Sequence, residues 1–145
     1  MEHVNSLFKD GKDSFYLFDL DGLSNWSKTF LQTWKSELSG VEAAYSYKTN
    51  SLKAITTLLK KSGFGAEVTS YSELQMALED GFSANEILID GPVKGRELIS
   101  EAVRRGIQLQ LDNLAEVDLS ITETIRQKNP VPPVFTLRLC HNEKG

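Results

Sequence analysis

The feature that most constrains this chain is a repeating unit of a short apolar strand followed by an amphipathic helix. The expected strand ends near Lys48, Thr69, Asp90 and Asp112 recur roughly every 21 residues, as they do where strands alternate with helices. The expected strands cover residues 42–47, 66–69, 86–89, 107–111 and 134–139. The expected helices cover residues 23–38, 52–61, 71–79, 95–105 and 114–126. This alternation predicts the α/β class, with parallel strands joined by right-handed crossovers.

Two architectures fit this alternation: an open doubly wound sheet and a (β/α)8 barrel. An open sheet that binds a dinucleotide would normally carry G-x-G-x-x-G after its first strand, and that motif does not occur in this sequence. In both architectures ligands bind beyond the carboxyl ends of the strands. We therefore expect the site residues at those strand ends.

Composition narrows the function classes. The chain has 145 residues, 40% of them hydrophobic, and its net charge is −4, which argues against disorder and gives no indication of a nucleic-acid partner. No apolar run reaches the roughly 18 residues that a membrane helix needs. The single cysteine, Cys140, allows no intramolecular disulfide and fits a reducing, cytoplasmic location.

A lysine ends the first expected strand, in the run YSYKTN at residues 45–50. In a barrel, the position of Lys48 points into the mouth. A lysine held among apolar side chains loses proton affinity, and a neutral amine can form a Schiff base with an aldehyde. The alternative is a lysine whose charged end reaches solvent or pairs with a carboxylate.

Two glutamates lie near the second strand end. Glu67 alternates with Val68, so one of them faces the barrel interior, where a carboxylate needs a partner; Lys48 on the neighbouring strand would serve. Glu73 lies three residues after Ser70, which is the spacing of a helix capping box. On spacing alone, Glu73 is interpreted as a partner of that cap.

Arg138 lies within the last apolar strand, and a buried arginine is rare unless it is paired. A guanidinium that faces a pocket suits a phosphate, carboxylate or phenolic oxygen. The alternative is an ion pair with Glu67 or Glu73.

Several motifs in register resemble the fold-type III pyridoxal-phosphate decarboxylases, which include the diaminopimelate, ornithine and biosynthetic arginine decarboxylases. Residues 45–50 resemble the signature Y-A-V-K-A/C-N, and residues 65–74 resemble G-x-D-V-x-S-x-x-E-L. Residues 14–19 resemble P-F-Y-V-Y-D, residues 86–94 resemble R-I-I/V-x-x-x-x-x-K, and residues 136–139 resemble a strand ending L-R-I/V. The order and spacing agree along nearly the whole chain.

The resemblance implies a partial (β/α)8 TIM barrel of the alanine-racemase-like type, with about the first five βα units. Residues 1–20 would form an N-terminal segment whose β-favouring run at 15–18 belongs to a second, β domain. Residues 21–145 would form the N-terminal part of the barrel that binds the cofactor.

The resemblance also implies a cofactor, pyridoxal 5'-phosphate, held through a Schiff base on the catalytic residue Lys48. Glu67, Glu73 and Arg138 match positions at the cofactor site. The implied reaction is decarboxylation of a basic or diamino acid of the diaminopimelate, ornithine, lysine or arginine type, with the cofactor taking up the electrons. The implied partners are a small amino-acid substrate and a second copy in a homodimer.

The chain departs from the family pattern in three ways. Glu67 is one methylene longer than the usual Asp. Tyr47 and Thr49 replace smaller residues beside the lysine, so we expect a narrower pocket. The family's stacking histidine, glycine-rich phosphate loop, Glu-x-Gly-Arg segment and partner-subunit residues have no match in these 145 residues.

We therefore expect this chain to be an incomplete portion of a decarboxylase that is inactive alone. Such a portion would expose two strand edges and an apolar barrel interior, so we expect it to dimerise or to pair with the missing part. The alternatives are a non-catalytic, partner-binding homologue and an amino-acid racemase.

Overall fold

The computed structural model describes residues 16–128 and 133–139. The strands are β1 (Ala44–Ser46), β2 (Gly65–Val68), β3 (Ile87–Ile89), β4 (Gln108–Leu111) and β5 (Phe135–Leu137). The helices are α2 (Leu20–Glu37), α3 (Lys53–Lys61), α4 (Tyr71–Glu79), α5 (Arg96–Arg105) and α6 (Leu114–Gln127), with a 3-10 turn η1 (Ala84–Glu86) before β3. The predicted alternation of strands and helices is confirmed.

Capping residues account for two of the shifted boundaries. Helix α2 begins at Leu20 because the side chain of Asp19 accepts a hydrogen bond from Gly22 N at 2.8 Å, as an N-cap does. Strand β3 begins after Glu86 because the side chain of Glu86 accepts hydrogen bonds from Ser83 N and Ser83 Oγ, at 2.8 and 2.6 Å, and thereby holds η1.

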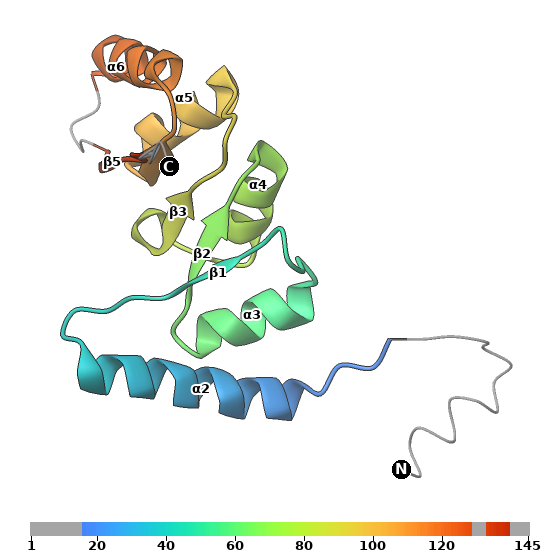
Figure 1. The fold of residues 1–145 in the computed structure, drawn as a ribbon. Coiled ribbons are helices and arrows are strands. Elements are labelled where there is room, and N and C mark those ends of the chain that lie inside the picture. Colours follow the sequence, from blue (N-terminus) through green and yellow to red (C-terminus); the bar gives the residue numbers. More distant parts are fainter. Residues whose placement is uncertain (1–15, 129–132, 140–145) are drawn as a thin grey trace, which may run out of the picture.

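The five strands are all parallel, and their order in the sheet, β1-β2-β3-β4-β5, follows the chain. A doubly wound sheet reverses its strand order at a switch point, and this sheet has no such reversal over its five strands. In Figure 1 the helices α3 to α6 follow one another along one side of the strands, and α2 lies beside α3. This is the arrangement of a partial barrel.

The two faces of the sheet differ in chemistry. Side chains that face the helices are apolar and buried: Ala66, Val68, Ile87, Ile89, Leu109 and Leu111. The other face, which is the inner face of the barrel, carries Ser46, Glu67, Leu88, Gln108, Gln110 and Thr136. The expectation of an apolar barrel interior is therefore wrong, because the apolar half of each alternating strand faces the helices.

Both edges of the described sheet are unpaired, since β1 pairs only with β2 and β5 only with β4. At the β5 edge, Phe135 and Leu137 are exposed on the helix side of the strand, and Ile121 and Ile125 are exposed on α6. The expected exposure of two strand edges is confirmed.

The predicted strand at residues 15–18 falls partly outside the described residues, and residues 16–19 form no strand. We expect residues 15–18 to form a strand by pairing with a second, β domain. The assignment of residues 1–20 to that domain therefore stays a prediction. Among residues 16–128 and 133–139, no helix combines the length and the apolar character needed to span a membrane.

Candidate functional site at the carboxyl ends of the strands

Lys48 follows β1, and its neighbours determine where it points. The adjacent Tyr47 is buried in the helix-facing core, where its hydroxyl donates to Asp80 Oδ2 at 2.9 Å and its ring meets Phe82 edge-on. Burial is the main cause that raises the pKa of the Tyr47 hydroxyl, and its hydrogen bond to Asp80 raises this pKa further. Lys48 lies in the turn after β1 and reaches the inner face, because its Nζ contacts Glu67 on that face. Tyr47 does not narrow the pocket as we expected, since it faces away from it.

Lys48 and Glu67 form an ion pair, with Lys48 Nζ 3.3 Å from Glu67 Oε1. The predicted pairing between these neighbouring strands is confirmed. The side chain of Lys48 is 57% exposed and that of Glu67 is 22% exposed. Lys48 is therefore not held among apolar side chains, because β1 is an edge strand whose inner face is polar.

Glu73 stabilises the start of α4. The hydroxyl of Ser70 accepts from Glu73 N at 3.2 Å, as predicted for the cap. The carboxylate of Glu73 reaches one residue further back than a capping box requires: its Oε2 accepts from Thr69 N at 2.7 Å and from Thr69 Oγ1 at 3.0 Å. Glu73 thus fixes the backbone immediately after β2.

Arg138, directly after β5, bridges two carboxylates. Its Nη2 lies 2.7 Å from Asp90 Oδ1, and its Nη1 lies 3.3 Å from Asp112 Oδ2. The expected partners Glu67 and Glu73 are wrong, because β5 pairs with β4, on the far side of β3 from those residues. The side chain is also 42% exposed rather than buried.

Asp90 and Asp112 were not singled out as site residues from the sequence, although each directly follows a buried strand. Asp90 Oδ1 also accepts from Gln110 Nε2 at 2.9 Å and from Gly91 N at 2.6 Å. Gly91 has a φ of +118°, and a Cβ on it would lie 3.3 Å from the Cβ of Thr69. Glycine is thus required where the β3 loop crosses the end of β2.

A buried lysine supports this part of the site. The side chain of Lys94 is 0% exposed, and its Nζ lies 2.9 Å from Glu116 Oε2 and 3.9 Å from Asp112 Oδ1 and donates to the carbonyl of Gly91. Glu116 also accepts from the backbone N–H groups of Lys94 and Asp112, each at 3.0 Å. Burial alone would raise the pKa of Glu116, but these hydrogen bonds outweigh it and lower the pKa.

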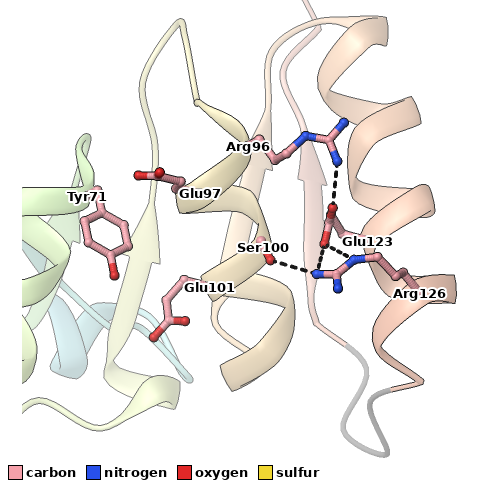
Figure 2. Close-up of a pocket in the computed structure, with 7 residues that line it drawn as sticks. All are labelled: Tyr71, Arg96, Glu97, Ser100, Glu101, Glu123 and Arg126. Atoms are coloured by element: carbon pink, nitrogen blue, oxygen red, sulfur yellow. Dashed lines mark hydrogen bonds and ion pairs between the residues drawn. The ribbon is translucent and has the colours of Figure 1, made fainter.

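A separate cavity of about 520 Å³ lies in the helix layer and is lined by Tyr71, Arg96, Glu97, Ser100, Glu101, Glu123 and Arg126. Figure 2 shows the side chains of Arg96 and Arg126 converging on Glu123. The distances are 3.2 Å from Arg96 Nη1 and 2.6 Å from Arg126 Nη2, and Arg126 lowers the pKa of Glu123 to about 2. The Arg96–Glu123 pair joins α5 to α6, and the Arg126–Glu123 pair lies within α6. We therefore interpret the ion pairs that line this cavity as structural.

The comparisons with known proteins agree with this geometry. Residues 27–138 match the sequence model of a family described as pyridoxal-dependent decarboxylase, pyridoxal binding domain. This chain belongs to that family. It is 30% identical over 142 residues to the diaminopimelate decarboxylase of Helicobacter pylori strain J99, and this alignment covers 98% of this chain and 34% of that protein. It is 30% identical over 110 residues to the ornithine decarboxylase of Caenorhabditis elegans, and this alignment covers 75% of this chain and 25% of that protein.

A solved structure shows the same fold. The diaminopimelate decarboxylase of Helicobacter pylori complexed with L-lysine aligns with a TM-score of 0.73 and 26% identity, over 86% of this chain and 32% of that chain. The α/β class and the partial barrel are thereby confirmed. The chain spans about a third of the length of the first of these relatives.

Proposed function

We propose that this chain carries the cofactor-attachment part of a pyridoxal 5'-phosphate-dependent decarboxylase that acts on a basic or diamino acid. The observation that carries the proposal is the Lys48–Glu67 pair, 3.3 Å apart on the inner face of a barrel of this family. The catalytic residue would be Lys48, and Glu67, Glu73 and Arg138 would belong to the cofactor site.

The donors on this rim suit the cofactor. Lys48 offers a primary amine for an aldehyde, and Glu67, in contact with it, can orient the amine and hold its proton. Arg138, held by two carboxylates, offers a guanidinium to an anionic oxygen. When bound, the cofactor supplies the electron sink for breaking the bond to the carboxylate. Glu73 acts on the site through Thr69, whose backbone it fixes.

The proposal includes the assembly of the whole protein. Residues 1–20 would contribute a strand to a second, β domain, and residues 21–145 would form the N-terminal part of the barrel. A homodimer and a cytoplasmic location are supported by the family resemblance and by the single cysteine, respectively.

The test is capture of pyridoxal 5'-phosphate by this chain. We expect a visible absorbance band on titration and, after borohydride reduction, a mass increase on the peptide that contains Lys48. The matched control is Lys53→Ala, which removes an exposed lysine at the start of α3 and should leave the band unchanged.

The outcomes separate the candidate functions. Loss of both the band and the mass increase in Lys48→Ala supports the proposal. A wild-type chain without a band, or a band that persists in Lys48→Ala, contradicts it and favours the non-catalytic alternative. For the whole protein, release of labelled carbon dioxide from a basic amino acid separates a decarboxylase from a racemase.

A further inference from the structure

We infer that Lys94 is a positioning residue that acts through Asp112 to set the direction in which Arg138 presents its guanidinium on the inner rim. All three steps of the inference concern described contacts. The presentation of the guanidinium to a cofactor rests on the proposed function.

The first step is that Lys94 cannot act on a ligand directly. Its side chain is 0% exposed and its ammonium is enclosed by Glu116, Asp112 and the carbonyl of Gly91. A buried ammonium persists only where such partners compensate for lost solvation. Any effect of Lys94 on the rim must therefore pass through the groups that it contacts.

The second step is that Asp112 lies between two cations. One oxygen, Oδ1, faces Lys94 Nζ at 3.9 Å, and the other, Oδ2, faces Arg138 Nη1 at 3.3 Å. The side chain is 10% exposed, and Oδ1 is buried without a hydrogen bond to any described residue. The nearby positive charge of Lys94 is what stabilises that oxygen, so it determines which way the carboxylate turns.

The third step is that Asp112 and Asp90 together fix the plane of Arg138. Each carboxylate holds a different terminal nitrogen of the guanidinium, Nη1 or Nη2, and a planar group held at two points has little rotational freedom. Within this network Arg138 is the most exposed side chain. Lys94 thus orients, from the interior, a group that faces the rim.

The experiment compares Lys94→Met with Lys60→Met. Lys60 is a chemically matched control, because its Nζ also donates to a backbone carbonyl, that of Gly81 at 2.6 Å, and lies 3.5 Å from a glutamate, Glu86. It lies at the other end of the sheet, next to the start of β3. The first measurement needs no cofactor: it is the order parameter of the Arg138 Nε–H group by NMR, with the signal assigned through its absence in Arg138→Lys.

We expect Lys94→Met and Asp112→Asn to lower this order parameter into the range of flexible groups, and Lys60→Met to leave it unchanged. The double variant Lys94→Met/Asp112→Asn should lower it no further than either single variant, because the two residues act in series. If Lys94→Met does not fold, Lys94→Met/Glu116→Gln, which removes both charges of the pair, replaces it. An Arg138 that stays ordered in these variants, or that is loosened equally by Lys60→Met, overturns the inference.

The second measurement is the affinity for pyridoxal 5'-phosphate. Lys94→Met and Asp112→Asn should weaken it by roughly tenfold, as loss of supporting residues does in metal sites, while Lys60→Met should not. Loss of Arg138 order with unchanged cofactor affinity refutes only the presentation of Arg138 to the cofactor. If the wild-type chain binds no cofactor but Lys94→Met and Asp112→Asn still lower the order of Arg138, the proposed function is refuted and the positioning role of Lys94 stands.

Discussion

The two halves of the rim differ in how firmly their charges are held. After β1 and β2, Lys48 and Glu67 form one ion pair that is partly exposed to solvent. After β3, β4 and β5, Arg138 and Lys94 join three carboxylates into a continuous network that is mostly buried. Exposed pairs contribute at most about 1 kcal/mol to stability, whereas removing one partner of a buried pair costs about 3–5 kcal/mol.

This difference would suit the tasks that the proposed function gives the two halves. As the proposed nucleophile, Lys48 would have to exchange its partner during the reaction, and a weak ion pair permits that exchange. As the proposed cofactor-orienting residue, Arg138 would have to stay in place, and the carboxylates Asp90 and Asp112 hold it. We call Lys48 and Glu67 the adaptable half of the rim. We call Arg138, Lys94 and their carboxylate partners the rigid half.

The largest expected effect is on stability. Lys94→Met leaves Glu116 buried without its cation and leaves Asp112 with Arg138 alone, so it should lower the free energy of unfolding by about 3–5 kcal/mol. Lys48→Met should change it by less than about 1 kcal/mol. Urea denaturation of both variants measures the contrast. Equal losses would remove the distinction between the two halves.

A smaller effect is expected where the two halves meet. Gly91→Ala places a Cβ 3.3 Å from Thr69 at a φ of +118°, so it should cost roughly 1–3 kcal/mol. Gly95→Ala is the control, because a Cβ there meets nothing within 4 Å and only the N-cap preference is lost, about 1 kcal/mol or less. Thermal unfolding of both variants checks the order, and a control that loses more than Gly91→Ala would refute it.

The rigid half should also depend on pH. The folded pKa of Glu116 lies below its ordinary value of 4.5, so its contribution to stability is fully present above that value and is lost as the pH falls through the folded pKa. The difference in unfolding free energy between wild type and Glu116→Gln should therefore narrow in acid. Parallel curves from neutral pH down to acid would show that the ionised carboxylate contributes nothing.

The smallest effect on stability is expected in the adaptable half. Glu67→Gln should change the free energy of unfolding by less than about 1 kcal/mol but should slow borohydride-trapped attachment of pyridoxal 5'-phosphate to Lys48, because the amine loses the group that holds its proton. Glu86→Gln, which removes a carboxylate next to Lys60, is the matched control. Equal attachment rates in both variants would assign Glu67 no part in the site.

The sequence predicted local features well and tertiary partners poorly. The bounds of α4 were predicted as observed because Ser70 caps the helix and Gly81 follows it. The Lys48–Glu67 pair followed from strand alternation. The partners of Arg138 were wrong because the lateral order of strands decides them. Lys94 was matched to a family motif, but its buried ion pairs were not predicted, because they depend on two loops folding against each other, which no local pattern records.

The chain-ordered sheet has a consequence for how the protein folds. Each strand pairs with the next strand in the chain, so every pairing closes only one strand–helix unit, and the entropy cost of closing a loop grows with its length. Proteins are synthesised from the N-terminus and begin to fold in that direction. The sheet can therefore be assembled in the order in which the ribosome delivers it. Among the residues of its ion network, Arg138 is synthesised after Asp90, Asp112 and Glu116, so it meets carboxylates that are already in place.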